Sequence, residues 1–290
     1  MMTITVPATS ANLGLGFDCL GLALDLNLTV RIIGPSDEWT IKHPYGADVP
    51  SDKRNLIIKT ALDLHPDLPA HQLEVTSDIP LARGLGSSSS AIVAGLLVGH
   101  LIKGDEIDQA QLLEEANQIE GHPDNVAPAI YGGLQLAQIL DGQVSSQTVP
   151  LPDLEALTFI PDYHLETKKA RAVLPKQIPY QDAVSQGQHL AALINAGWNR
   201  DLAAFQVLLE KDKLHEPYRA ELVPELREIR QLFHANDIKG TYLSGAGPTI
   251  ITMVAAGKGQ KAEELLAKAK LKGQIRLLQI NQHGFTITKD

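Results

Sequence analysis

The segment Pro80-Leu-Ala-Arg-Gly-Leu-Gly-Ser-Ser-Ser-Ser-Ala91 places two glycines and four hydroxyls directly before an apolar run, residues 92–102. Glycine lets a backbone approach a ligand closely and adopt positive φ. The apolar run is typical of a buried helix, and a helix N-terminus offers unpaired N–H groups and a positive dipole end. Both features favour an anion, so the segment predicts a phosphate-binding loop. The residues predicted to bind the phosphates are Pro80, Leu81, Ala82, Arg83, Gly84, Leu85, Gly86, Ser87, Ser88, Ser89 and Ser90.

A flexible linker or an ordinary helix cap is the alternative interpretation of this segment. A linker is flanked by polar sequence, whereas this one lies between a strand-like stretch, residues 73–79, and the apolar run. The segment is not a Walker A motif, because no Gly-Lys-Ser/Thr follows its glycines. It is not a Rossmann fingerprint either, because the third glycine is absent.

Composition restricts the class of protein. The chain has 290 residues, 44% hydrophobic and 20% charged, which is typical of one large globular domain or two smaller ones. Its net charge of −9 argues against a nucleic-acid surface. No apolar run approaches the roughly 18 residues that a membrane span needs, and the N-terminus lacks the features of a signal peptide. Cys19 is the only cysteine, so no intrachain disulfide is possible, and we expect a soluble cytoplasmic protein.

Strand-like and helix-like patterns alternate along the whole chain, which predicts the α+β class. Residues 107–119 have apolar positions at helical spacing, and residues 185–209 show a longer helical pattern that is interrupted near Gly197. Residues 275–280 are expected to form the final strand. Two prolines punctuate a polar stretch at residues 150–153, which predicts a boundary between domains 1–152 and 153–290.

Three further segments accompany the predicted phosphate loop. They are Val6-Pro-Ala-Thr-Ser-Ala-Asn-Leu-Gly-Leu-Gly-Phe-Asp-Cys-Leu-Gly-Leu22, Glu120-Gly-His-Pro-Asp-Asn-Val-Ala-Pro128 and Gly240-Thr-Tyr-Leu-Ser-Gly-Ala-Gly-Pro-Thr249. Together the four segments resemble the motifs of the GHMP kinases, in that superfamily's order, from about residue 3 to about residue 255. The segments Val6–Leu22 and Glu120–Pro128 also resemble the homoserine kinase branch of the superfamily.

This resemblance implies a two-domain fold. Residues 1–152 would form an ATP-binding domain of the ribosomal protein S5 domain 2-like fold, and residues 153–290 a ferredoxin-like domain. The active site would lie in the cleft between them. The implied activity is transfer of the ATP γ-phosphoryl group to the hydroxyl of L-homoserine, giving O-phospho-L-homoserine for threonine synthesis. ATP and Mg²⁺ would be required, and a homodimer is a reasonable expectation for such kinases.

The resemblance assigns the metal site to Glu120 and to a hydroxyl of the Ser87-Ser88 pair, with Ser88 preferred. Mg²⁺ needs only a few oxygen ligands from the protein and usually keeps several waters. The alternative for Glu120 is a solvated residue in the last turn of a helix. That position is unfavourable for an anion, because the C-terminal end of the helix dipole is negative.

The resemblance also assigns catalytic roles to the segment after Glu120. Asn125 would orient the substrate hydroxyl, and Asp124 is a candidate catalytic base. A loose transition state makes early proton removal less necessary, so the role of Asp124 as base stays open. Asp124 could instead cap a helix that begins near Val126. His122 would contact the substrate, although a histidine at a helix end is often structural.

The charges of homoserine decide the remaining assignments. An arginine fork suits its carboxylate, and the resemblance matches Arg171 and Arg219 to that role. Asn12 and Asp18 match the positions that hold the ammonium and hydroxyl groups. A surface ion pair is the alternative for either arginine, and a pair with a neighbouring cation is the alternative for Asp18. Thr167 and Gly245 are contacts of second rank, and the turn at residues 244–248 would close over the substrate or the nucleotide.

Other functions compete with this interpretation. A mevalonate-type or diphosphocytidyl-methylerythritol kinase acts on a substrate without an ammonium group, which leaves Asn12 and Asp18 without a task. A catalytically silent relative should have lost Glu120 or Ser88, and both are present. An RNA-binding module is disfavoured by the acidic net charge, and fold analogy alone would not support it.

Overall fold

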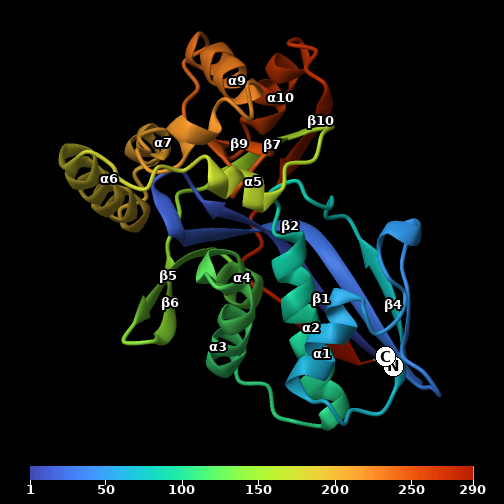
Figure 1. Cartoon of the computed structure of the whole chain (residues 1–290). Helices are drawn as coiled ribbons and strands as arrows, with labels where there is room; N and C mark the ends of the chain where they lie inside the picture. The colour runs from blue at the N-terminus through green and yellow to red at the C-terminus, as the bar shows by residue number, and fades with distance from the viewer. Residues whose placement is uncertain (290) are drawn as a thin grey trace.

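Two β-sheets, one of seven strands and one of four, organise the chain (Figure 1). The structure is a computed structural model that describes residues 1–289. The mixture of largely antiparallel sheets and packed helices confirms the predicted α+β class. The strands are β1 (Met2–Asn12), β2 (Gly16–Pro35), β3 (Thr40–Lys42), β4 (His71–Ser77), β5 (Leu134–Leu140), β6 (Gln143–Val149), β7 (Leu154–Pro161), β8 (Thr241–Leu243), β9 (Ile250–Ala255), β10 (Gly273–Leu278) and β11 (Thr286–Lys289). The helices are α1 (Leu56–Leu64), α2 (Ser87–Lys103), α3 (Gln109–Glu120), α4 (Pro123–Tyr131), α5 (Thr167–Ala172), α6 (Tyr180–Trp198), α7 (Leu202–Leu209), α8 (Glu216–Arg219), α9 (Glu225–His234) and α10 (Gly259–Ala267), with a 3₁₀ turn at Gly46–Asp48.

The first sheet is built around the long antiparallel pair of β1 and β2. Its strand order is β11-β1-β2-β4-β3, and β5 and β6 extend from the far part of β2. Only β3 pairs in parallel, with β4. β2 is 20 residues long, and the turn at residues 13–15 that precedes it lies next to α6 and α7 of the second half of the chain (Figure 1).

Helix α2 is the central helix of the first half. It is apolar on nearly all sides and mostly buried, as expected of a helix surrounded by other elements. Gly95 and Gly99 let it pack closely against α1, because a Cβ at Gly95 would meet the carbonyl oxygen of Ile57 at 2.6 Å. β4 leads into the predicted phosphate loop and α2 leads out of it, so both flanks predicted from the sequence are confirmed.

The second sheet has the order β10-β7-β9-β8 and is antiparallel throughout. A separate apolar cluster, which includes Phe159 and Phe233, joins it to α9 and α10. The helical pattern at residues 185–209 is resolved into α6 and α7, and the break lies near Gly197 as expected, with the Asp201 side chain capping α7. Within residues 1–289, no helix combines the length and apolar character that crossing a bilayer would need.

The end of the chain departs from the sequence-based expectation. Residues 275–280 were expected to form the final strand, but β11 follows and pairs antiparallel with β1, with Met2 opposite Lys289. β1 to β6 lie in the first sheet and β7 to β10 in the second, so the sheets divide the chain close to residue 152. β11 returns residues 286–289 to the edge of the first sheet, and the division into domains 1–152 and 153–290 stays a prediction.

Candidate active site

A cavity of about 480 Å³ lies where the two halves of the chain meet. It is bounded by the turn between β1 and β2, the predicted phosphate loop, the α3–α4 turn, helices α5 and α8, and the turn at residues 245–247. Most of the residues predicted for the site therefore share one cavity. The predicted residues that line it are Asn12, Asp18, Leu81, Ala82, Arg83, Gly84, Gly86, Ser87, Ser88, Ser89, Glu120, His122, Asp124, Asn125, Thr167, Arg171, Arg219 and Gly245.

Three residues predicted to bind the phosphates do not line the cavity: Pro80, Leu85 and Ser90. Leu85 is buried in the core, and its carbonyl accepts a hydrogen bond from Thr9 N. The Ser90 hydroxyl donates to Pro7 O at 2.8 Å, and its N–H donates to Gly86 O. The Leu85 carbonyl and the Ser90 hydroxyl thus fasten the loop to β1, and the role of the loop amides in binding phosphate stays a prediction.

The loop itself depends on two glycines with left-handed backbone. Gly84 has φ +76° and Gly86 has φ +67°. A Cβ at Gly84 would lie 2.5 Å from Ser244 O, and a Cβ at Gly86 would meet the Thr9 hydroxyl. Gly86 is the N-cap of α2, and no side chain among the described residues caps that helix. The first-turn N–H groups of α2 are therefore available to an anion at the cavity.

The turn after β8 supports this loop from behind. The Ser244 hydroxyl donates to Gly84 O at 2.6 Å and can accept from the Ser10 hydroxyl, which lies 2.9 Å away. Thr249 N donates to Arg83 O at 3.1 Å. The turn was expected to close over a ligand; it lines the cavity and also fixes the phosphate loop from the other half of the chain.

Glu120, the last residue of α3, points toward the first turn of α2. Its Oε1 accepts a hydrogen bond from the Ser89 hydroxyl at 2.9 Å. Burial raises the pKa of Glu120, and the bond from Ser89 opposes that rise. Ser88, the serine predicted to share the metal with Glu120, is exposed at the cavity, whereas the serine that donates to Glu120 is Ser89. The solvated alternative for Glu120 does not hold, because the residue is half-buried and its carboxylate accepts a hydrogen bond from buried Ser89.

His122, Asp124 and Asn125 form a connected group at the start of α4. His122 Nδ1 lies 2.6 Å from Asp124 Oδ1, and this bond is the main cause of the raised pKa of His122. Asn125 Nδ2 donates to the same oxygen at 3.3 Å, and Asn125 Oδ1 accepts from the Thr9 hydroxyl at 2.8 Å. Asp124 does not cap α4, because the N-cap is His122. Its buried carboxylate instead faces the cavity.

Asp18 and Arg171 form a bidentate ion pair across the cavity. Arg171 Nη2 donates to Asp18 Oδ1 at 2.8 Å, and Nη1 donates to Oδ2 at 3.2 Å. Asn12 positions Asp18 by accepting a hydrogen bond from its N–H at 3.1 Å, and Asn12 Nδ2 donates to Gly245 O. Asp18 and Arg171 therefore do form an ion pair, as the alternative interpretation expected. The pair lies in the cavity, however, and joins the two halves of the chain.

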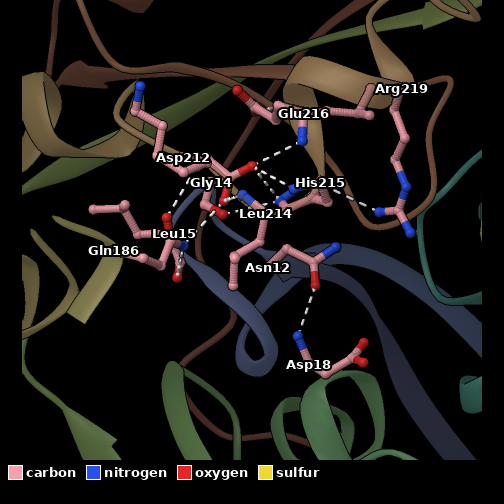
Figure 2. A network of polar contacts seen from close by, with 12 residues as sticks. Asn12, Gly14, Leu15, Asp18, Gln186, Asp212, Leu214, His215, Glu216 and Arg219 are labelled. Carbon is pink, nitrogen blue, oxygen red and sulfur yellow. Dashed lines mark hydrogen bonds and ion pairs between the residues drawn. The ribbon is translucent and has the colours of Figure 1, made fainter. Parts of the chain in front are cut away.

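Arg219 is nearly completely buried, with 2% of its surface exposed. Its Nη1 donates to Gly245 O at 2.9 Å and lies 3.2 Å from His215 Nδ1 (Figure 2). His215 Nε2 lies 2.9 Å from Gly14 O, so a neutral His215 can donate to Gly14 and accept from Arg219. Burial, followed by the nearby Arg171, lowers the pKa of Arg219 to about 10. The pair of arginines is thus a concentrated positive charge that favours an anionic group.

Phe17 and Asp212 complete the support of Arg219. The Phe17 ring stacks on His215 with centroids 5.3 Å apart, and the guanidinium groups of Arg171 and Arg219 lie 5.7 and 5.4 Å from its centroid. The Asp212 carboxylate accepts from the N–H groups at the start of α8 and from Gln186 Nε2, which also donates to Leu15 O (Figure 2). Sequence reasoning missed His215, Asp212 and Gln186, since these three residues lie in none of the four motifs, and it gave Phe17 no role.

Three residues of the β1–β2 turn and its flank have strained backbone. Asn12 has φ +73°, Leu13 has φ +43° and Asp18 has φ +57°. Asn and Asp tolerate the left-handed region better than other residues, whereas Leu does not. Strain of this kind clusters where a site must be held in one geometry. Here it holds Asn12 and Asp18 toward the cavity.

A mainly apolar part of the cavity lies beyond the phosphate loop. It is formed by the segment between β3 and α1 together with β4. The sequence carries no motif for this part, because its residues are scattered and mostly hydrophobic. Its lining includes His43, Tyr45, Val49, Asn55, Leu56, Ile57, Val75 and Ile79.

Comparison with known proteins agrees with this geometry. Residues 55–133 match the family model of the GHMP kinases N terminal domain, and residues 190–273 match that of the GHMP kinases C terminal. A homoserine kinase of Lactiplantibacillus plantarum is 50% identical over the full length of both chains, and one of Leuconostoc mesenteroides is 48% identical over the same extent. The solved structure of a candidate homoserine kinase from Listeria monocytogenes has a TM-score of 0.89 and 35% identity, and each chain is fully covered.

Proposed function

Because this chain belongs to the homoserine kinase family of the GHMP kinases, we propose that it transfers the γ-phosphoryl group of ATP to the hydroxyl of L-homoserine. The products are ADP and O-phospho-L-homoserine. One observation carries the proposal: Arg171, Arg219 and Asp18 share a cavity with the glycine loop at the start of α2. An amino-acid alcohol and a nucleotide can therefore occupy the same cavity.

The nucleotide is assigned to the loop and to the apolar part of the cavity. Its phosphates fit against the first turn of α2, where left-handed Gly84 and Gly86 leave no room for side chains. Its base fits between the segment that carries Tyr45 and the strand that carries Val75. Stacking and apolar burial favour a base there, while the helix dipole favours the phosphates.

The donor set around Glu120 fits Mg²⁺. The Glu120 carboxylate and the hydroxyls of Ser88 and Ser89 supply oxygen atoms at the end of the phosphate loop, and Mg²⁺ needs only a few such ligands. Magnesium, when bound, neutralises charge that develops on the phosphates during transfer. In this proposal Glu120 stays ionised to hold the metal, and its carboxylate has lone pairs left for the bond from the Ser89 hydroxyl.

Homoserine is assigned to the side of the cavity that carries the two arginines. Its carboxylate fits between the guanidinium groups of Arg171 and Arg219, which lie over the same Phe17 ring. Its ammonium group fits Asp18, whose carboxylate is bound by Arg171 in this structure. The substrate ammonium can replace Arg171 as the partner of Asp18, and the substrate carboxylate can replace Asp18 as the partner of Arg171. Both protein charges therefore remain neutralised. Thr167 and Gly245 lie close enough to close this part of the cavity.

The substrate hydroxyl is assigned to Asn125 and Asp124. Asn125 is fixed by the Thr9 hydroxyl and can orient the nucleophile. Asp124 is held in place by His122, and its carboxylate can accept the proton as the bond to phosphorus forms. A loose transition state does not need an early base, so positioning is the larger contribution expected from this group.

The cellular setting follows from the same activity. The product is an intermediate for threonine synthesis, and we propose that the enzyme works in the cytoplasm, where ATP and Mg²⁺ are supplied. Cys19 is a free, half-buried cysteine, and its partial burial, with the nearby Asp124 and Asp18, raises its pKa to about 11. A thiol of this kind is unreactive and compatible with a reducing compartment.

A coupled assay for ADP release tests the proposal. L-Homoserine should support turnover with MgATP, whereas mevalonate and diphosphocytidyl-methylerythritol should not. O-Phospho-L-homoserine should be identified by mass spectrometry. Turnover of mevalonate without turnover of homoserine would reject the assignment.

A further inference from the structure

A second group of ligand atoms lies at the opposite end of α2 from the cavity. His65 is the C-cap of α1, His100 is in the last turn of α2, and Asp105 follows that helix. One nitrogen of each histidine and a carboxylate oxygen of Asp105 all lie within 4.8 Å of one another. His65 Nε2 is 2.9 Å and His100 Nδ1 is 3.2 Å from the same atom, Asp105 Oδ2.

The contacts of the two histidines direct one nitrogen of each ring toward the centre of the cluster. His100 Nε2 lies 2.8 Å from the Glu115 carboxylate, and donating there leaves a lone pair on Nδ1, directed at Asp105. His65 Nε2 is buried and makes no hydrogen bond among the described residues, although it is close to the same oxygen. His100 Nδ1 and His65 Nε2 both approach Asp105 Oδ2, so two imidazole nitrogens and a carboxylate oxygen converge on one place, where a metal ion can replace the protons of these contacts.

We propose that His65, His100 and Asp105 bind a zinc ion. Two imidazole nitrogens and one carboxylate oxygen form a donor set that suits Zn²⁺ better than Mg²⁺ or Ca²⁺. Ligand atoms about 3 Å apart fit bonds of about 2 Å to one central ion. The bond from His100 to Glu115 matches the second carboxylate that commonly orients a metal-binding histidine. Asp105 is 37% exposed on its side chain, so water can reach the fourth position.

The ion would join three segments rather than take part in phosphoryl transfer. It links the end of α1, the end of α2 and the loop that leads to α3. At 1.5 Å per residue, His100 lies about 20 Å along α2 from the phosphate loop. The site is also separate from Asp18, His122 and Asp124, whose atoms converge within the catalytic cavity. We therefore expect zinc to raise stability and to leave the kinase reaction unchanged.

Zinc titration of the full chain, after removal of metals with a chelator, tests the site. Calorimetry should show one equivalent bound, and Tm should rise by about 5 °C at a hundredfold excess over Kd. Co²⁺ in place of Zn²⁺ should give the visible absorption of a tetrahedral nitrogen-containing site. The variants His65→Ala and Asp105→Asn should each weaken zinc binding at least tenfold and lose the rise in Tm, with kcat unchanged.

The exposed histidine variant His283→Ala is the matched control and should bind zinc as the parent chain does. Zinc taken up only in the catalytic cavity would persist equally in His65→Ala and Asp105→Asn, and that result would overturn the proposal. If His65, His100 and Asp105 form only hydrogen bonds with one another, zinc will neither bind nor raise Tm. That result would also overturn the proposal.

Discussion

Glu120 illustrates at the scale of one residue how a fold prepares a charge for a ligand. Its carboxylate is removed from water at the end of a helix, where the dipole also disfavours an anion, and burial raises its pKa. A divalent cation reverses that disadvantage. We expect Glu120→Gln to lower kcat about 10²- to 10³-fold, with a smaller effect on homoserine binding and a flattened response to Mg²⁺.

Steady-state kinetics over a range of Mg²⁺ concentrations checks this prediction. The exposed residue Glu106 offers a matched control, and Glu106→Gln should behave as the parent enzyme. An unchanged Mg²⁺ response in Glu120→Gln would show that Glu120 is not a ligand.

The raised pKa of Glu120 also predicts how activity depends on pH. Protonation of the carboxylate removes the metal ligand, so activity should fall as pH decreases through this pKa, which lies above the usual pKa of a glutamate. Mg²⁺ competes with the proton, so a higher Mg²⁺ concentration should move the acid limb of the kcat profile to lower pH. Profiles at limiting and saturating Mg²⁺ measure this shift, and superimposable limbs would contradict it.

His215 orients Arg219 through a specific nitrogen, and two substitutions separate its contacts. Asn can keep an acceptor at the Nδ1 position toward Arg219, whereas Gln can keep a donor at the Nε2 position toward Gly14. We expect His215→Gln to raise the KM for homoserine about tenfold to hundredfold, with little change in the KM for ATP, because Arg219 loses its partner. His215→Asn should have the smaller effect.

Both variants lose the stacking on Phe17, so their Tm values should be similar and a stability effect can be separated from the kinetic one. Equal KM values for homoserine in the two variants would show that the Arg219 contact is not what His215 contributes.

At the scale of an element, the phosphate loop and α2 could be predicted because local physics decides both. Two glycines, a set of hydroxyls and an apolar run define the turn and the buried helix regardless of distant contacts. The Ser89 contact could not be predicted, because the side of α2 that faces Glu120 is set by tertiary packing, including the close contact of Gly95 and Gly99 with α1. β11 was missed for a similar reason: four residues form a strand only when β1 is beside them.

Gly86 and Gly104 test the loop with two substitutions on one helix. Both have left-handed φ, so alanine at either position should cost about 1 kcal/mol. A Cβ at Gly86 would also meet Thr9 and approach Asn125, whereas a Cβ at Gly104 would meet nothing within 4 Å. We expect Gly86→Ala to raise the KM for ATP at least tenfold and Gly104→Ala to lower Tm alone. Steady-state kinetics and thermal melts of both variants test this prediction. Equal KM values for ATP in the two variants would contradict the assignment of the loop to phosphate binding.

At the scale of the whole molecule, the site exists only where the two halves meet. The four motifs could be identified from the sequence, and most of their residues line one cavity. The support for Arg219 and the apolar part of the cavity could not be identified. Asp212, Gln186 and the residues around Tyr45 become neighbours of the site only after long-range folding. A homodimer stays a prediction.

Ser244 joins the second half of the chain to the phosphate loop, and Ser244→Ala tests that connection. The substitution leaves Gly84 O and the Ser10 hydroxyl with fewer partners in a buried place, so we expect a loss of about 1–3 kcal/mol of stability. The KM for ATP should rise at the same time, because the loop loses its support. Thr252→Val, which breaks the buried Thr241–Thr252 pair in the second sheet, is the control and should lower Tm without raising that KM. If both variants lose stability and neither changes the KM for ATP, the junction is a structural contact only and the loop is positioned by the first half alone.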